Sequence, residues 1–483
     1  MTLVHYRQHG AACVQRWPDI MIETSLATAL IVAALMAQAA PVPMVALPLP
    51  SGDPMAIDLD NDPLIAIERE TAPQAAFEAL MTQAIDRHPA ISEAKAGVDE
   101  ADAARDLARA AQLPSGDVTF SSARTLARDF SNDPNNIIER SRRAQRTDAL
   151  ATIQQPLFDF GAGAQRSAAA KARITAAAAR VDATVDEIAL RAVAVWYDVF
   201  ALRALFGIAR GFADDQAKLA EAVEARIGQG LSPRSDRARV VSFTASAASQ
   251  RARIRRALDS AEARFAELFG APPPSDIRRA PYPELPTLSR DAATLRAATN
   301  AGVRAAEAEA SAGLKEAKAA KADILPTVSA GIDAGRYGVF ETDSDYDIRA
   351  RLTLRYRLFG GGDARAEQFA ARARSSNARA ERIREEARRD AAIAWADVNA
   401  LVDQLGALRS SYVASRQSRD TIAERFRVAR GSLFDLLAAE QSFFETATGY
   451  LQAITDLDTA RYILLARTGG LADALGIKPG ARR

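Results

Sequence analysis

The sequence predicts a mostly α-helical protein that also contributes β-strands to a membrane barrel. Three observations predict this fold class: an apolar segment near the N-terminus typical of an export signal, proline-free helical stretches too long for one globular core, and segments in which apolar and polar residues alternate with a period of two. The same order of helix, strand pair and long helices occurs twice in the 483 residues, which indicates duplication of a whole architectural unit.

The composition argues against an enzyme. Hydrophobic residues make up 48% of the chain but aromatic residues only 6%, and alanine supplies much of the apolar fraction, as expected for helices that pack closely. One cysteine and three histidines leave little material for a metal site or a histidine base, so we expect no metal and no cofactor. Because 62 basic residues face 61 acidic ones, bulk charge favours no nucleic-acid partner.

Residues 1–40 are expected to be a signal peptide. Residues 26–37 form an uninterrupted apolar run of the length of a signal-peptide core, too short to span a membrane, and the small residues at 37–39 fit an A-x-A cleavage pattern. Translation starts at the first residue or at Met21. Cys13 precedes the apolar run, the reverse of a lipoprotein signal, so no acylation is expected. A buried helix or a tail anchor is the alternative interpretation of this segment.

The remainder of the chain divides into two copies of one pattern. Residues 41–72 form an irregular leader, and the first copy covers residues 73–270. A proline-rich linker at 271–290 joins it to the second copy at 291–476, which leaves a short tail at 477–483. The landmarks that recur at a nearly constant offset are Leu157 with Leu358, Trp196 with Trp395, and Gly230 with Gly431.

Each copy contains a helix far longer than a globular domain needs. In the first copy it runs from about Gly161 to Gly228 with no internal proline, which corresponds to about 100 Å at 1.5 Å per residue. Its counterpart starts at 360–362 and breaks at 429–435, after which a further helix follows. Helices of this length must pack along one another. A plain coiled-coil rod would explain the helices, but it would not explain the segments between them.

The segments between the helices predict antiparallel hairpins. In the second copy, residues 327–335 and 347–358 alternate apolar and polar side chains and are joined by a polar turn. Residues 117–127 and 147–158 form a weaker pair in the first copy. One apolar and one polar face suit a barrel with lipid outside and water inside, although an ordinary hairpin with one wet face would show the same pattern. Four strands cannot close a pore, so several protomers must each contribute four.

The polar side of the last predicted strand is rich in arginine. In a barrel, Ile348, Leu352 and Leu354 would contact lipid. The residues that would then line the lumen are Arg349, Arg351, Arg355 and Arg357. We expect a dense positive lining, offset in part by Asp333 and by acidic residues in the loops.

Three further motifs are interpreted as structural. The glycine clusters at 161–163 and 360–362 are turns and not phosphate-binding loops, because no Gly-Lys-Ser/Thr follows either of them. The acidic residues in 58–62 lack the spacing of a calcium loop and are expected to lie in a solvated linker. His88 is expected on a helix surface. No serine, cysteine or lysine comes with a recognisable base, so no catalytic site is expected.

Four segments together resemble the TolC family of outer-membrane channels. Two of them, QQPLFDFGAG at 154–163 and YRLFGGG at 356–362, lie where a strand turns into a long helix. The other two, RIGQGLSPRSDRA at 226–238 and RFRVARGSLFDLLAAEQSFF at 425–444, lie at the helix breaks. Each is weak alone, but their doubled order is specific and covers about residues 73–476. The resemblance implies a homotrimer in which each protomer gives four strands to a twelve-stranded outer-membrane barrel, continuous with a periplasmic tunnel of twelve helices.

The resemblance also implies roles for individual positions. The strand-to-helix turns would be formed by Gly161, Gly163, Gly360 and Gly361, since glycine permits a sharp change of direction. The helix breaks would be periplasmic tips where an adaptor protein docks, with the residues Gln229, Gly230, Leu231, Ser232, Arg430, Gly431, Ser432, Leu433 and Phe434. Asp435 would ring the closed periplasmic gate, while Ala438 stands at the position of a second acidic residue in the family.

Both tips are expected to start their second helix with a side-chain cap. Ser232 followed by Pro233 fits an N-cap with proline at the first helical position. Ser432 and Asp435 fit a capping box, so Asp435 would cap the helix, line the pore, or do both. At the second tip the family often shows a glycine where Ala429 stands and commonly a basic residue near Gly431, and departures here bear on the details of adaptor docking.

The function that the resemblance implies is export through the outer membrane of a Gram-negative bacterium. The channel would receive substrates from an inner-membrane transporter, of the ABC or the proton-driven type, through a periplasmic adaptor. The segment RGSLFDLL at 430–437 resembles tips of channels paired with type I secretion systems, which favours protein secretion over multidrug efflux. The alternative is an exported coiled-coil rod or adaptor without a pore, which would be soluble and show no conductance.

Overall fold

The computed structural model describes residues 45–54, 57–282, 288–341, 345–428 and 430–477. The predicted signal peptide at 1–40, with Met21 and Cys13, lies outside the described residues. So do Ala429 and residues 478–483 of the predicted tail.

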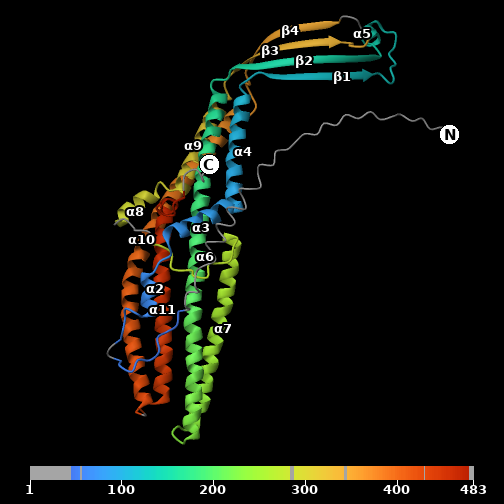
Figure 1. Cartoon of the computed structure of the whole chain (residues 1–483). Coiled ribbons are helices and arrows are strands. Elements are labelled where there is room, and N and C mark those ends of the chain that lie inside the picture. The colour runs from blue at the N-terminus through green and yellow to red at the C-terminus, as the bar shows by residue number, and fades with distance from the viewer. Residues whose placement is uncertain (1–44, 55–56, 283–287, 342–344, 429, 478–483) are drawn as a thin grey trace, which may run out of the picture.

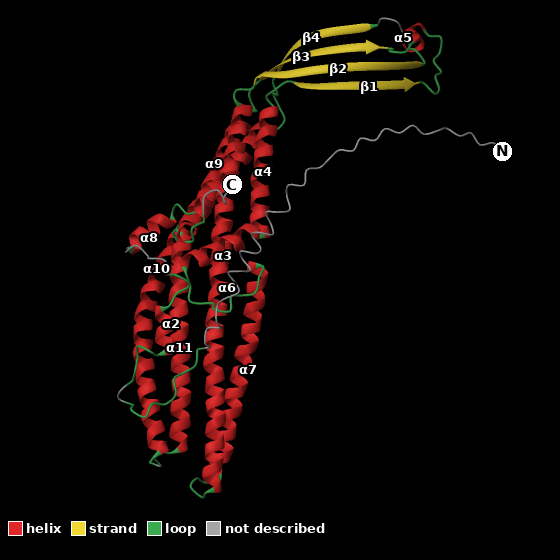
Figure 2. Cartoon of the chain, in the orientation of Figure 1, coloured by secondary structure: helices red, strands yellow, loops and turns green. Residues whose placement is uncertain are grey.

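The protein is an elongated helical body with a four-stranded sheet at one end (Figure 1, Figure 2). The elements in chain order are α2 (Pro63–Arg69), α3 (Gln74–Arg87), α4 (Pro89–Ala110), β1 (Ser115–Arg124), a 3-10 turn (Pro134–Asn136), α5 (Ile137–Ser141), β2 (Gln145–Phe158), α6 (Ala162–Gly228), α7 (Ser235–Phe269), α8 (Arg290–Ala297), α9 (Ala301–Ala322), β3 (Thr327–Tyr337), β4 (Tyr346–Arg355), α10 (Gly362–Arg427), α11 (Leu433–Arg467) and α12 (Leu471–Ala474). Each strand pair is followed by a long helix and a shorter one. The predicted fold class, mostly helical with a small duplicated sheet, is confirmed.

The sheet is antiparallel with the order β1-β2-β3-β4. Its strands lie close to the predicted segments, but β4 ends at Arg355, three residues before the predicted end at Leu358. The alternation of the sequence continues past this point. The backbone nevertheless leaves the sheet there, because it must already turn towards α10 at Gly360 and Gly361.

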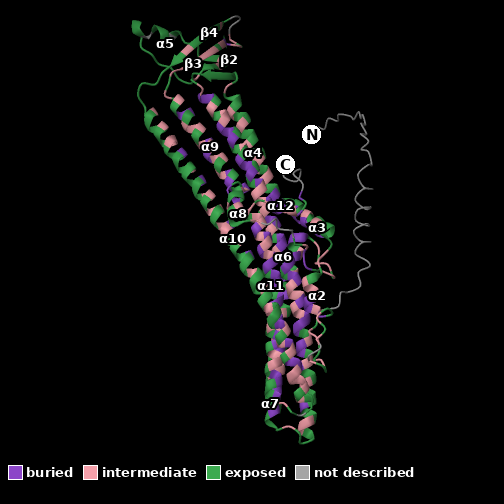
Figure 3. Ribbon diagram, turned by 90° about the vertical axis from the view of Figure 1, so that its left-hand side faces the viewer, coloured by how far each residue is buried: buried purple, intermediate pink, exposed green. Residues whose placement is uncertain are grey.

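The long helices form two antiparallel hairpins, α6 with α7 and α10 with α11, whose tips lie at the end of the molecule opposite the sheet (Figure 1). Closer to the sheet, α4 and α9 pack along α6, and α9 also packs along α10. Buried positions lie along α6 and in the middle of the body, while the sheet and much of α10 are exposed (Figure 3). Many buried positions of α6 are alanine, such as Ala169, Ala176 and Ala189, which lets neighbouring helices approach closely.

The apolar character of α6 is explained by this packing. Ala162–Gly228 contains a window of 18 residues that is apolar enough to cross a membrane by composition alone. In the structure, however, 61% of that window is buried inside the protein. The window therefore belongs to the core of the helical body.

The first predicted helix, from about Ala75 to Leu113, is two helices in the structure. α3 ends at Arg87 and α4 begins at Pro89, because the residue before a proline is disfavoured in the helical conformation. His88 lies between them, and its Nδ1 accepts a hydrogen bond from Ala90 N at 3.2 Å. His88 is thus a helix cap and not a helix-surface residue as expected.

The proline-rich linker packs against both copies of the repeat. The indole N–H of Trp196 donates to Arg278 O at 2.9 Å, and that of Trp395 donates to Leu288 O at 2.8 Å, so the two landmark tryptophans bind the linker in the same way. Arg279 and Asp458 form a buried ion pair between the linker and α11, with Nη2 and Oδ1 2.7 Å apart. The linker is therefore a structural element of the body.

Candidate functional site

The pairing register gives the sheet one apolar and one polar face. Residues paired directly across an antiparallel sheet point to the same side, so the register extends the alternation of each strand across all four. The apolar face carries Val118, Phe120, Ala149, Ala151, Ile153, Val328, Ala330, Ile332, Ala334, Ile348, Ala350, Leu352 and Leu354. Its large side chains are exposed in the single protomer, with Leu352 72% exposed. Such a continuous apolar face suits contact with the hydrocarbon of a bilayer.

The opposite face holds acidic and basic side chains in equal number. The acidic residues are Asp117, Asp148, Asp333 and Asp347, and the basic ones are Arg146, Arg349, Arg351 and Arg355. Arg351 Nη2 lies 2.9 Å from Asp333 Oδ2, and Arg349 pairs with Asp347. The expected dense positive lining is therefore wrong for this face, because Asp333 of β3 and Asp347 of β4 pair with arginines of β4, and β1 and β2 add Asp117 and Asp148. Arg357 lies past the end of β4, in the turn to α10.

Glycines form both turns between the sheet and the long helices. The three with a left-handed backbone are Gly161, Gly360 and Gly361, with φ of 82°, 128° and 75°. The carboxylate of Asp159 accepts hydrogen bonds from Gly161 N at 3.0 Å and from Gly163 N at 2.6 Å. A Cβ on Gly163 would lie 2.8 Å from Cγ of Gln112, so only glycine fits without a shift. The sequence indicated the glycines but gave no reason to single out Asp159 or Gln112.

The first hairpin ends in a tight turn made by predicted tip residues. Gln229 follows the last residue of α6, and Gly230 comes next with φ of 73°, a conformation that glycine adopts without strain. Leu231 is 66% exposed although its side chain is apolar. The turn thus presents an apolar side chain to solvent at the far end of the molecule.

Ser232 is not the N-cap that the sequence predicts. The helix α7 begins only at Ser235, and within the described chain no side chain accepts a hydrogen bond at that start. A further turn lies between, closed by a hydrogen bond from Asp236 N to Pro233 O at 3.1 Å. The proline therefore occupies this turn and not the first helical position.

The second hairpin tip has the serine half of the predicted capping box. The Oγ of Ser432 accepts a hydrogen bond from Asp435 N at 3.1 Å, at the start of α11. Leu433 is buried, whereas Phe434 and Asp435 are exposed. One turn of the helix therefore presents an aromatic ring and a carboxylate to solvent and points an aliphatic side chain inwards.

The chain just before this cap folds back onto the end of α10. Arg430 N donates a hydrogen bond to Arg425 O at 2.9 Å. A Cβ on Gly431 would lie 3.0 Å from Phe426 N, a tight contact that a neighbour would have to relieve by a small shift. Glycine at 431 therefore permits the close return of the backbone.

A small apolar cluster joins the two tips, and we call it the tip cluster. It consists of Val223, Val240, Leu433 and Leu437, from α6, α7 and α11. Beside it, the guanidinium of Arg226 lies 4.7 Å from the centre of the Phe426 ring and donates to Phe426 O at 3.4 Å. The Nε of Arg226 is buried without a hydrogen-bond partner in the described part of the chain. Five partly buried side chains pack against the cluster: Leu219, Ala220, Ile227, Phe243 and Phe426. The two hairpins thus touch at their ends.

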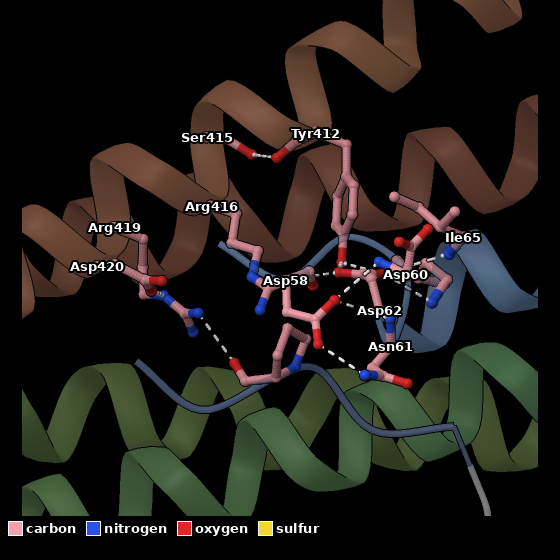
Figure 4. Close-up of polar contacts among 12 residues, drawn as sticks. Asp58, Asp60, Asn61, Asp62, Ile65, Tyr412, Ser415, Arg416, Arg419 and Asp420 are labelled. Atoms are coloured by element: carbon pink, nitrogen blue, oxygen red, sulfur yellow. Dashed lines mark hydrogen bonds and ion pairs between the residues drawn. The ribbon is translucent and has the colours of Figure 1, made fainter. Parts of the chain in front are cut away.

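The leader packs into the helical body, and this is the largest departure from the sequence-based expectation. Its described residues before α2 form no helix or strand, as expected of an irregular segment. Residues 45–54 and 57–69, which we call the N-terminal strap, run between the helices of the two hairpins (Figure 4). The strap ends in the short helix α2, whose Leu64 and Ile65 are fully buried. The sequence predicts that Asp62 is solvated, but the residue is only 1% exposed. Its carboxylate caps α2 and pairs with Arg416 of α10.

A two-faced sheet continued by helices of about 100 Å defines a channel-forming protein of the outer membrane with a tunnel in the periplasm. The sequence matches the outer membrane efflux protein family over residues 80–271 and 295–470, and the chain belongs to that family. It is an outer-membrane efflux channel of the tripartite class.

Known relatives cover most of the chain. The outer membrane efflux protein BepC of Brucella suis is 23% identical over 84% of this chain and 89% of its own length. Protein CyaE of Bordetella pertussis is 28% identical over 79% of this chain and 81% of its own. The crystal structure of the outer membrane protein VceC of Vibrio cholerae has the same fold, with a TM-score of 0.71 at 18% identity over 82% of this chain and 96% of that one.

Proposed function

We propose that three copies of the chain assemble into one channel. The single observation that supports this most strongly is the two-faced sheet, in which β1 and β4 are edge strands with unpaired backbone groups. Lipid does not tolerate such edges, and pairing β4 of one copy with β1 of the next would close a barrel of twelve strands. The apolar face then meets lipid and the face with Arg349, Arg351 and Arg355 meets water.

The tips of the hairpins are the part that we propose to dock a periplasmic adaptor. They present the exposed side chains of Leu231 and Phe434 at the end of the molecule farthest from the sheet. Through this adaptor the channel would receive its substrate from an inner-membrane ABC or proton-driven transporter. We favour type I protein secretion over multidrug efflux, on the resemblance of residues 430–437 to tips that serve such systems.

Asp435 is the residue that we propose for the periplasmic gate. It is exposed in the first turn of α11, next to the second tip. In a trimer, three such carboxylates at one constriction would attract cations and repel each other. The closed state then depends on nearby apolar contacts, and the tip cluster supplies them.

Assembly is tested by the native mass of the mature protein in detergent, which we expect to be three times that of one chain. A stable monomer that keeps its β-sheet signal in circular dichroism would refute the trimer. A trimer without conductance in planar bilayers would instead favour a rod or adaptor without a pore.

The assignment of the two faces is tested by a pair of neighbouring substitutions in β4. Leu352→Arg places a charge on the lipid face and should cost roughly 2–4 kcal/mol if the site lies near the bilayer midplane, with a loss of inserted trimer. Arg351→Leu should leave the amount of trimer unchanged and alter ion selectivity. Equal tolerance of both changes, measured by heat-modifiable gel mobility and conductance, would show that the assignment of the two faces is wrong.

A further inference from the structure

The N-terminal strap lies across both hairpins, between the middle of the body and the tips. We propose that the strap is the pivot of channel opening: it fixes the two hairpins to each other, so that opening separates only the part of the hairpins beyond it. This inference rests on the proposed gate at the tips and adds the device that decides how much of the helical body moves.

The strap buries apolar side chains against all four helices of the hairpins. Leu64 and Ile65 have no exposed surface and belong to one cluster with side chains of α6, α7, α10 and α11. The other members of this cluster are Ala204, Ile208, Ala209, Phe212, Ala213, Ala247, Tyr412, Phe443, Phe444, Ala447, Tyr450, Leu451 and Ile454. Moving the hairpins apart at this level would expose the whole cluster to water.

A buried carboxylate fixes the strap to α10. Asp62 Oδ2 lies 2.6 Å from Arg416 Nη1 and 2.8 Å from the hydroxyl of Tyr412, while Oδ1 accepts from the backbone N–H groups of Leu64 at 2.9 Å and Ile65 at 3.2 Å (Figure 4). Burial raises the pKa of the Tyr412 hydroxyl, so it stays protonated as a donor. Both oxygens of this carboxylate are thus used, and releasing the strap would leave Arg416 buried without its partner.

The start of the strap makes two further contacts, one on each hairpin. Arg419 of α10 donates from Nη2 to Pro48 O at 2.9 Å (Figure 4). Its guanidinium also lies 4.3 Å from the ring centre of Phe443. On α6, a Cβ at Gly207 would lie 2.4 Å from Val45 O, so the strap backbone lies directly on that helix. The strap is therefore held on both sides along its length.

The position of these contacts divides each hairpin into two parts. Arg416 lies 11 residues before Arg427, the last residue of α10, which is about 16 Å along the helix. Beyond that level the described contacts between the hairpins are mainly those of the tip cluster with the side chains packed on it, of Arg226 with Phe426 and of Arg239 with Phe434. The tips can therefore part by losing these contacts while the strap keeps all of its own.

The first test compares Asp62→Asn with Asp60→Asn in the full-length protein. Asparagine keeps an oxygen that can cap α2 but deletes the charge that faces Arg416. Asp60 lies two positions earlier with its side chain 87% exposed, and its ion pair with Arg69 is at the surface, so its substitution is the matched control. Tyr412→Phe removes one hydrogen-bond donor to Asp62 and is the milder variant. It tests the proposal if Asp62→Asn does not assemble.

We expect Asp62→Asn to form trimers, to spend at least about five times as long open in planar bilayers, and to exchange the tip amides about tenfold faster than the wild type. Tyr412→Phe should show the same changes to a smaller extent, and Asp60→Asn should match the wild type. Unchanged open time and tip exchange in both Asp62→Asn and Tyr412→Phe would overturn the proposal.

The second test distinguishes a pivot from a strap that leaves on opening. Leu437→Ala removes a fully buried side chain from the tip cluster and should make tip opening more frequent. If the strap is the pivot, the amides of Leu64 and Ile65 stay as protected as in the wild type while those of the tips exchange faster. Parallel loss of protection in strap and tips would overturn it. Absence of conductance in every variant would count against the channel function alone, because the exchange comparison does not depend on conductance.

Discussion

The two places that hold the hairpins together, the strap region and the tip cluster, differ in what they bury. At the strap, aromatic rings stack in series, with Tyr412 5.5 Å from both Phe443 and Tyr450, around a buried ion pair of Asp62. At the tips, the contact has only four buried aliphatic side chains at its centre, with partly buried side chains around them and one arginine on each of Phe426 and Phe434. Separating large stacked rings and a buried ion pair costs more free energy than separating a small cluster at a helix end.

This difference indicates where the molecule is built to stay together and where it can part. Both regions join the same helices, so helix length and propensity do not distinguish them. The distinction comes from a segment outside the repeat, because the strap adds Leu64 and Ile65 to the interface at one level only. Duplication produces two similar hairpins. The leader strengthens the contact between them only at the level of the strap.

The largest effect is expected from Asp62→Ala. This change removes the helix cap and leaves Arg416 and the hydroxyl of Tyr412 without their shared partner in a buried site. Breaking a buried pair in this way typically costs about 3–5 kcal/mol. Thermal unfolding of the trimer should show a clearly lowered Tm, and Asp60→Ala should not. Similar Tm values for the two variants would contradict the difference between the strap region and the tips, because Asp62 would then contribute no more to stability than an exposed residue of a surface loop.

A pH dependence is expected from Glu440, which lies 3.8 Å from Arg419 beside the strap. Burial raises the pKa of Glu440 above its ordinary 4.5, against the opposing effect of the Arg419 charge. Between pH 4.5 and this raised pKa the folded state holds a proton that the unfolded state releases, so stability falls as pH rises through that window. Glu440→Gln should flatten this part of the Tm profile. A profile that keeps the wild-type slope would show that Glu440 is not its source.

A smaller effect is expected at the tips from Arg226→Met. The Nε of Arg226 is buried without a partner in the described residues, so an apolar chain of similar length should change the free energy of unfolding by no more than about 1 kcal/mol in either direction. Native-state exchange of the tip amides measures this. A loss as large as that of Asp62→Ala would mean that the tips, too, depend on a buried charge.

The smallest effect on stability is expected from Asp435→Asn. Its side chain is exposed, and its backbone N–H, which bonds to Ser432, is kept in the variant. If Asp435 lines the gate, cation selectivity and block by divalent ions should fall while Tm stays nearly constant. Unchanged selectivity with a lowered Tm would instead assign Asp435 a capping role only.

The sheet and the long helices could be predicted because their sequence signals are local. Apolar and polar residues alternate in 347–355, which indicates a strand with two different faces. The absence of proline from Ala162 to Gly228 indicates one continuous helix. The charge of the polar face could not be predicted in the same way. It depends on the register that sets Asp333 opposite Arg349, and register joins segments that no local pattern relates.

The strap was missed because its partners are remote in the sequence. Asp62 and Arg416 are separated by 354 residues, and an acidic run read alone resembles solvated linker. One local signal was available: Asp62 followed by Pro63 and an apolar run is the pattern of a capped short helix. That pattern predicts α2, but not its packing against the helices of both hairpins.

The comparison between the two regions is tested most directly by native-state hydrogen exchange of the wild-type trimer. The amides of Leu64 and Ile65 in the strap and those of residues 433–437 at the second tip can be followed in one sample. We expect the tip amides to exchange through frequent local opening and the strap amides only through much rarer opening of the helical body, at least about tenfold more slowly. Strap amides that exchange as fast as the tip amides would contradict the proposal that the strap stays in place while the tips open.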